Sequence, residues 1–419
     1  MEINFKKLGI EVKSGKCYNK KVSGEIYEND KRSYIGYMKQ EIFDKLVLKI
    51  KKNTEEIGGE LGEYPATTDG VYFADKSKKL ELSHIFNWTQ SFYAGMTYYG
   101  WLLSGDKELE NWLFEQYEAY YNKVFKTPMD TMHDLGFLYS PYAVALYKET
   151  GDEKMKEIGI KAADCLAMRY VPNGNYIQAW GRMDGIVPDY VSESLRENVF
   201  FKSGKGRVIV DCMMNLPLLF WASEVTGHPF YANIAKSHAD MVLKYFIRED
   251  DSICHAFLFD YETGELKEEA NSCGYANGSH WVRGTAWAVY GYVIAYDYTK
   301  NEKYLDASIK LFEKFIEECG GKMPVWDFRL PETEPQNIDT SAIAVMLCAA
   351  LEILKHTKNE KIEAFMDDFE ELLMEYVDLD LSNNGLLKEQ NGRHTYTCYG
   401  DYYLVEYLCM KYKNTKRIW

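Results

Sequence analysis

Two aspartates occupy positions where a carboxyl group could transfer protons, and Asp211 is the more distinctive. It interrupts the apolar run RVIVDCMMNLPLLFWA, residues 207–222. Because proline is tolerated in the first turn of a helix, Pro217 predicts a helix that begins near Asn215, with Asp211 at its mouth. Burial disfavours a charged carboxylate, and a raised pKa suits a general acid that works near neutral pH. Capping of the helix start explains Asp211 equally well, because aspartate is a preferred N-cap residue.

Asp134 has a similar place, in MHDLGFLY before another apolar helix. If the two helices are neighbours, both carboxyl groups enter one site, where a like charge raises the pKa of one of them. Such carboxyl pairs carry out glycosidic chemistry. An N-cap is again an equal interpretation. We interpret Asp339 and Asp401, which precede other helices, as caps or supporting groups.

Four further side chains could bind a ligand. Arg283, in SHWVRGTAW, is followed by Gly284, which lets backbone approach, and its guanidinium suits a carboxylate. A structural ion pair is the alternative. Trp88 and Trp281 could stack on a sugar ring or pack in the core. His255 lies on a predicted hairpin in a long connection, where a lone histidine is more often structural than catalytic.

Composition and missing motifs exclude several classes of protein. Lys and Arg total 49 against 64 Asp and Glu, so the net charge of −15 disfavours nucleic acid or an anionic membrane as partner. We find no metal-ligand cluster, P-loop, nucleophile elbow or dinucleotide motif, and we expect no cofactor. Nine scattered cysteines favour reduced thiols. With no apolar leader segment or membrane-spanning run, we expect a cytoplasmic protein.

The chain that must position these residues alternates two kinds of helix. Helices that are apolar nearly all round are each followed, except for the last one in the chain, by a short turn and an amphipathic helix rich in Lys and Glu. Counting a first amphipathic helix from about Tyr34, there are six of each kind. A recurring helix hairpin predicts a closed or stacked array, either a ring of six inner and six outer helices or an open α-solenoid. The expected parts are an N-terminal extension, residues 1–33, and one barrel domain, residues 34–419.

A ring makes a specific prediction about the site. Its inner helices run in the same direction, so their N-terminal ends gather at one face of the molecule. Nearly every residue considered above precedes or begins an inner helix. Converging helix N-termini also favour a negatively charged ligand, because of their unpaired N–H groups and helix dipoles.

Five motifs together resemble one known family. They are VIVDCMMNLPLLFWA, SHWVRGTAWAVYG, MHDLGFLY, FNWTQSFYAGM and YGDYYLVEYL. The chain from about Asn87 to its end is similar to glycoside hydrolase family 88, the unsaturated glucuronyl hydrolases. This resemblance implies an (α/α)6 barrel. It also implies a substrate: short oligosaccharides left by polysaccharide lyases, of glycosaminoglycan type or from a bacterial polymer, with a 4,5-unsaturated uronic acid at the non-reducing end.

The resemblance also implies roles for residues. Asp211 matches the general acid/base, which protonates C4 of the vinyl ether and helps water add at C5; the resulting hemiketal collapses and frees the neighbouring sugar. Asp134 matches a second aspartate that holds the unsaturated ring. Four residues match the substrate-binding residues of the family: Trp88, His255, Trp281 and Arg283. A pocket tyrosine of the family is matched by either Tyr399 or Tyr402. Cys273 departs from the family, which commonly carries glutamine there.

Three other functions remain open at this point. The Trp-x-Arg-Gly-x-x-Trp run is shared with unsaturated rhamnogalacturonyl hydrolases. A conventional inverting glycosidase would use Asp134 and Asp211 as acid and base, with their carboxyl groups about 6.5–9.5 Å apart. A non-catalytic sugar-binding or scaffold protein would not need Asp211 for its behaviour.

Overall fold

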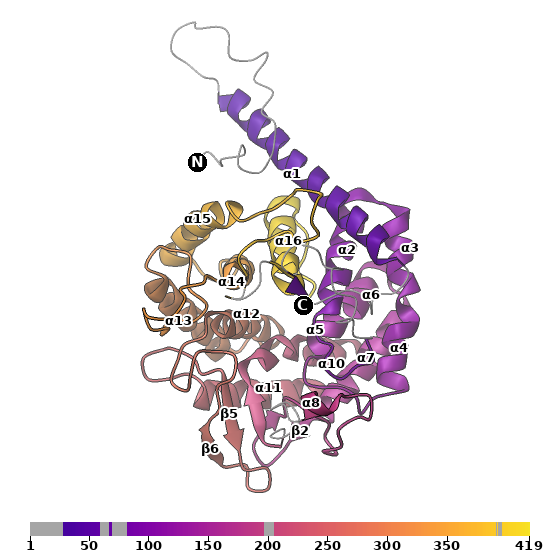
Figure 1. Cartoon of the computed structure of the whole chain (residues 1–419), viewed down its shortest axis with the longest axis vertical. Helices are drawn as coiled ribbons and strands as arrows, with labels where there is room; N and C mark the ends of the chain where they lie inside the picture. Colours follow the sequence, from indigo (N-terminus) through magenta and orange to yellow (C-terminus); the bar gives the residue numbers. More distant parts are fainter. Residues whose placement is uncertain (1–27, 59–66, 69–81, 197–204, 391, 393–395) are drawn as a thin grey trace, which may run out of the picture.

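The computed structural model describes the chain except for residues 1–27, 59–66, 69–81, 197–204, 391 and 393–395. Most of the expected N-terminal extension thus lies outside the described residues. Helix α1 (Glu28–Ile57) begins before Tyr34, so the expected boundary between residues 33 and 34 falls inside one helix. Figure 1 shows the start of α1 projecting away from the rest of the molecule.

The described helices form an inner and an outer layer. The inner helices are buried along most of their length: α2 (Gln90–Ser104), α5 (Leu135–Tyr139) continued by η4 (Ser140–Val144) and α6 (Ala145–Thr150), α10 (Leu216–Thr226), α12 (Val282–Thr299), α14 (Thr340–Ile353) and α16 (Cys398–Lys413). The outer helices are amphipathic: α1, α3 (Lys107–Glu115) with α4 (Tyr117–Phe125), α7 (Glu153–Ala167), α11 (Pro229–Tyr245), α13 (Glu302–Cys319) and α15 (Glu360–Met374). In Figure 1, α13 and α15 lie at the periphery with α14 inside them.

The inner layer closes into a ring. Each inner helix contacts the next along the chain, and α16 contacts α2. The fold is therefore the predicted all-α, (α/α)6 barrel, and the open α-solenoid is excluded. The shared core consists mainly of side chains from the inner helices together with the apolar stripes of the outer ones.

The turns between inner and outer helices follow local rules. Gly105, Gly151 and Gly227 end their helices with positive φ angles of 66°, 71° and 68°, a conformation in which a side chain would be strained. Asp106 and Asp152 then cap α3 and α7, each accepting a hydrogen bond from a backbone N–H two residues later. These turns reverse the chain and make all inner helices run in one direction.

Short strands cover the N-terminal end of the barrel. β4 (Arg207–Ile209), β5 (Ala256–Phe259) and β6 (Leu266–Glu269) form an antiparallel sheet in that order, and the β5–β6 hairpin is visible at the lower left of Figure 1. Ile209 pairs with Ala256, and the N–H of Val210 donates to the carbonyl of His255 at 2.9 Å. The remaining described elements are β1 (Thr67–Thr68) paired with β7 (Tyr396–Thr397), β2 (Tyr170–Val171) paired with β3 (Tyr176–Ile177), η5 (Val210–Met214) and α8 (Glu193–Arg196).

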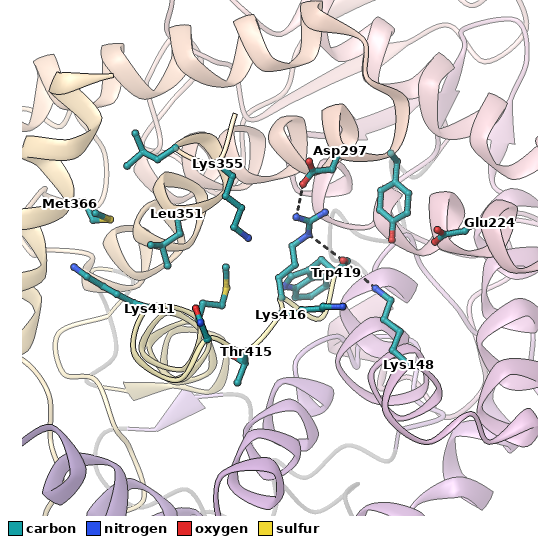
Figure 2. A pocket seen from close by; sticks show the side chains of 15 residues that line it. Lys148, Glu224, Asp297, Leu351, Lys355, Met366, Lys411, Thr415, Lys416 and Trp419 are labelled. Atoms are coloured by element: carbon teal, nitrogen blue, oxygen red, sulfur yellow. Dashed lines mark hydrogen bonds and ion pairs between the residues drawn. The ribbon is translucent and has the colours of Figure 1, made fainter. Parts of the chain in front are cut away.

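The opposite end of the barrel, where the inner helices terminate, contains a cavity of about 810 Å³. Figure 2 shows its lining, with Lys148, Lys355 and Lys416 around it and Trp419 at its base. None of the candidate site residues lines this cavity. Among the described residues, no helix has the length and hydropathy needed to cross a membrane.

Candidate active site

Asp211 lies in η5, the 3₁₀ turn between β4 and α10. The helix begins at Leu216 with Pro217 in its first turn, close to the predicted start. Ile209 and Asn215 hold the N-cap positions of η5 and α10, and neither element receives a capping bond from Asp211. The capping interpretation of Asp211 is therefore wrong.

The Asp211 carboxyl is buried, with 9% of the residue exposed. Its Oδ2 has no hydrogen-bond partner among the described residues. Burial raises the pKa of Asp211 to about 7, although its own backbone N–H and the charge of Arg283 pull that pKa down. A carboxyl group with this pKa is protonated in a large fraction of molecules at neutral pH.

His255 faces Asp211 from the strand that pairs with β4. Its Nε2 lies 3.7 Å from Asp211 Oδ2, and its Nδ1 accepts a hydrogen bond from the N–H of Ser272 at 3.2 Å. Burial, helped by the charges of Arg207 and Arg283, lowers the pKa of His255 to about 3, so the ring is neutral. A neutral ring with Nδ1 accepting carries its proton on Nε2, which points an N–H toward Asp211.

Asp134 occupies the N-cap position of α5, yet its side chain makes no capping hydrogen bond. It lies 3.3 Å from Nε2 of His133, a buried ring whose pKa burial holds well below its usual value. Burial, and then the negative charge of Asp211, raises the pKa of Asp134 well above its ordinary value; the charges of Arg169 and Lys123 oppose this rise. The two aspartates are thus close enough to influence each other, as predicted for neighbouring inner helices.

Aromatic rings and Arg283 form the other part of the site. Trp88 stacks on Tyr399 with ring centroids 5.4 Å apart. The Arg283 guanidinium lies 4.8 Å from the ring centroid of Trp281 and 5.1 Å from that of Tyr399. Arg283 also pairs with Asp339, the residue that caps α14, which confirms the alternative prediction of a structural ion pair. The Trp281 ring meets His255 edge-on at 5.2 Å, which joins the aromatic group to the carboxyl group.

The two candidate tyrosines separate. Tyr399 belongs to the cluster with Trp88 and Arg283. Tyr402 lies one turn further into α16 and is fully buried, with Phe92 and Trp419 among its neighbouring rings. The structure therefore brings Asp134, Asp211, Trp88, His255, Trp281, Arg283 and Tyr399 to one end of the barrel and leaves Tyr402 in its interior.

Comparison with known proteins shows the family of the chain. The model of Glycosyl Hydrolase Family 88 matches residues 67–295. The unsaturated glucuronyl hydrolase of Bacillus sp. strain GL1 is 30% identical over 363 residues, which cover 83% of this chain and 92% of that protein. This chain belongs to glycoside hydrolase family 88.

Other members of family 88 match over nearly the whole chain. The unsaturated chondroitin disaccharide hydrolase of Streptococcus agalactiae serotype III strain NEM316 is 29% identical, and the alignment covers 91% of this chain and 93% of that protein. A crystal structure of unsaturated glucuronyl hydrolase from Streptococcus agalactiae matches with a TM-score of 0.79 at 29% identity, covering 96% of this chain and 99% of that one. The protein is thus a glycoside hydrolase with the barrel of its family.

Three residues of this family 88 site escaped the sequence analysis. The Trp180 ring lies 6.4 Å from His255, and the Arg207 guanidinium lies 5.1 Å from the centroid of Trp180. Asn215 links α5 to η5 through its side-chain amide. Trp180 lies in a long connection without helical pattern, which gave no signal. Arg207 and Asn215 belong to the same motif as Asp211, and their closeness to it was the available clue.

Cys273 lies half-buried beside the site. Its sulfur is close enough to Arg207 and Arg283 to influence the pKa of both guanidinium groups. Among the described residues, no group of three or more His, Cys, Asp or Glu side chains could hold a metal ion. All eight described cysteines are free thiols, and Cys17 lies outside the described residues.

Proposed function

We propose that this protein releases the 4,5-unsaturated uronic acid from the non-reducing end of short oligosaccharides by adding water to the C4=C5 bond. The observation that carries the proposal is Asp211, a buried carboxyl group that caps no helix and has a pKa of about 7. Its relatives are named as hydrolases of unsaturated chondroitin disaccharides and as unsaturated glucuronyl hydrolases, which supports this substrate class.

Asp211 acts first as a general acid. The protonated carboxyl donates its proton to C4, and the positive charge that develops at C5 is shared with the ring oxygen. The Asp211 carboxylate then accepts a proton from the water that adds to C5, so the carboxyl group is restored and one water is consumed. The product is a hemiketal, which opens the ring and frees the neighbouring sugar. General acid–base help of this kind contributes about 10²–10⁴-fold in rate.

The surrounding groups suit this reaction. The N–H on Nε2 of His255 faces Asp211 and stabilises its carboxylate after the proton has left. Asp134, with its raised pKa, can remain protonated and hold a ring hydroxyl without adding a second negative charge. Arg283 offers positive charge to the substrate carboxylate, and the stacked Trp88 and Tyr399 provide an apolar face for the sugar ring.

We also propose the organisation around this site. The barrel, in which we include all of α1, acts as one catalytic domain without a cofactor. The substrate comes from a glycosaminoglycan or a bacterial polysaccharide. The expected location is the cytoplasm, which fits the free thiols of the described cysteines.

An ultraviolet assay tests the proposal. The C4=C5 bond conjugated to the carboxylate absorbs, and hydration abolishes the absorbance. Wild type should remove the signal of unsaturated chondroitin, hyaluronan or heparin disaccharides, sulfated or unsulfated, whereas Asp211→Asn should not. The preferred disaccharide then names the parent polymer.

Two controls separate the alternatives. Loss of signal only with an unsaturated rhamnogalacturonan disaccharide would assign the rhamnogalacturonyl activity instead. Cleavage of a saturated glycoside, with every unsaturated disaccharide unchanged, would replace hydration by a conventional inverting mechanism. Binding without any turnover, unaffected by Asp211→Asn, would indicate a sugar-binding protein.

A further inference from the structure

We propose that Asn215 is a positioning residue that caps the helix of Asp134 from the neighbouring inner helix and so keeps the Asp134 carboxyl available to substrate. The expected effect on catalysis rests on the proposed function. The capping role of Asn215 rests on the hydrogen bonds of its side-chain amide alone. These contacts involve the two elements that carry the candidate aspartates.

The first contact replaces an ordinary cap. The opening N–H groups of a helix lack intrahelical partners, and an N-cap side chain usually accepts from the second or third of them. In α5 the N-cap residue is Asp134, but the N–H of Phe137, the third helical residue, donates to Asn215 Oδ1 at 2.8 Å. Asn215 therefore provides the capping hydrogen bond of α5 in place of Asp134.

The second contact holds Asp211. Asn215 Nδ2 donates to the carbonyl oxygen of Asp211 at 3.3 Å, so one amide joins the first turn of α5 to η5. The orientation of the amide is set by its partners, because only its oxygen can accept from an N–H and only its nitrogen can donate to a carbonyl. Asn215 is fully buried, and both ends of its side chain are used.

Gly136 makes this approach possible. A β-carbon at Gly136 would lie 2.4 Å from the Cα of Asn215 and 2.7 Å from its carbonyl oxygen, which are distances that backbone atoms do not tolerate. The second residue of α5 must therefore lack a side chain. Gly136 and Asn215 together set how closely the two aspartate-bearing elements pack.

The consequence concerns the proton on Asp134. A carboxylate that accepts a backbone N–H bond is favoured in its charged form, so a capping Asp134 would have a lower pKa. With Phe137 N–H occupied by Asn215, burial and the charge of Asp211 act on Asp134 without that opposing bond. Asp134 can then stay protonated and donate a hydrogen bond to substrate.

Asn215→Leu tests the inference, because leucine has the same branching as asparagine, with larger methyl groups, and cannot accept from Phe137. We expect Asp134 to turn back and cap α5, with its pKa falling by about one unit or more and kcat falling about tenfold or more. The pKa is measured on the free protein by carbon-13 NMR titration of labelled aspartate carboxyls, with the Asp134 signal assigned from Asp134→Asn. The pH profile of kcat reports the same change in the enzyme at work.

Asn301→Leu is the matched control. Asn301 is exposed and caps the outer helix α13 through the N–H of Lys303, so its loss removes a helix cap, typically worth about 1 kcal/mol, far from the site. This variant should lose thermal stability and keep both the pKa of Asp134 and the pH profile. Gly136→Ala offers a second route, since it pushes Asn215 away from α5 and should lower the pKa of Asp134 in the same direction.

The outcomes separate this inference from the proposed function. A lowered pKa of Asp134 in Asn215→Leu supports the capping role even if wild type hydrates no unsaturated disaccharide. An unchanged pKa, with activity lost only in proportion to stability as in Asn301→Leu, overturns it even if hydration is confirmed.

Discussion

At the scale of single residues, the buried carboxyl of Asp211 links stability to pH. Its pKa in the folded protein, about 7, lies above the ordinary value of 3.8, so the folded state binds its proton more tightly than the unfolded state. The associated stabilisation is fully present below the ordinary pKa and is lost as pH rises through about 7. Ionisation of Asp211, which the reaction needs, therefore lowers the stability of the folded protein.

Asp211→Asn should therefore be more stable than wild type at high pH. The amide does not titrate, so the gain in unfolding free energy should grow between pH 4 and pH 8, toward an upper bound of about 4 kcal/mol for a shift of about three pKa units. Thermal melts of both proteins across this range measure the difference. A gap in Tm that stays constant with pH would show that Asp211 titrates normally in the folded protein.

His255 should act through its N–H and not through its own ionisation. With a pKa of about 3 it is neutral at any working pH, while its Nε2 lies 3.7 Å from Asp211. We expect His255→Phe to lower kcat about tenfold, because the N–H dipole that faces the Asp211 carboxylate from beyond hydrogen-bond distance would be lost. His255→Gln, which keeps an N–H donor, should retain more activity. If the limb of the pH profile above neutrality vanished in His255→Phe, the titrating group would be His255 and not Asp211.

At the scale of elements, the β4–β5 pairing aligns Asp211 with His255. Gly206, directly before β4, has a φ of +79°, and a β-carbon there would lie 2.1 Å from the carbonyl oxygen of Phe259. That oxygen is backbone of β5, so Gly206→Ala must displace the strand. We expect a fall in kcat of at least tenfold while the helical barrel remains folded, measured by kinetics and circular dichroism.

Gly227 provides the comparison for this prediction. It also has a positive φ, +68°, but a β-carbon there would meet nothing within 4 Å. Gly227→Ala therefore carries similar backbone strain without displacing a strand, and it should cost stability alone. Equal loss of kcat in both variants would mean that strain, and not the position of β5, controls activity.

The alternation of helices predicted a ring or an open solenoid of inner and outer helices, because burial over many turns leaves a periodic pattern, and the resemblance to a known family selected the barrel. Local geometry was not predictable in the same way. Whether Asp134 and Asp211 cap their helices depends on partners from other elements, such as Asn215, which a linear pattern does not reveal. Tyr399 and Tyr402 differ by three positions on one helix, so only the packed structure separates them. Trp180 lies in an irregular connection, where position follows from tertiary contacts.

At the scale of the whole molecule, the last described residues hold together the C-terminal ends of several inner helices. Arg417 pairs with Asp297 of α12 and Glu352 of α14, and Lys148 of α6 donates to the carbonyl of Ile418 at 2.9 Å. Several of these groups line the cavity in Figure 2. The segment therefore ties three inner helices together at the end opposite to the site.

Trp419 extends this connection toward the substrate. Its Nε1 donates to Glu406 of α16 at 3.1 Å, and its ring lies 6.4 Å from Phe92 and 6.1 Å from Phe137. Both phenylalanines are neighbours of Trp88, at 6.3 and 5.7 Å. A chain of packed rings thus runs along the barrel axis from Trp419 to the face on which we propose that the sugar stacks.

Trp419→Ala should weaken both the fold and substrate binding. Truncation of a buried tryptophan costs about 3–5 kcal/mol, and the space left beneath Phe92 and Phe137 should loosen Trp88. We expect a lower Tm and a higher Kd for the unsaturated disaccharide, measured by calorimetry in an Asp211→Asn background so that no turnover occurs. Trp221 is equally buried but packs against Tyr147 and Gly159, away from these rings. Trp221→Ala should therefore lower the Tm and leave Kd unchanged, and an equal rise of Kd in both variants would reduce the role of Trp419 to stability alone.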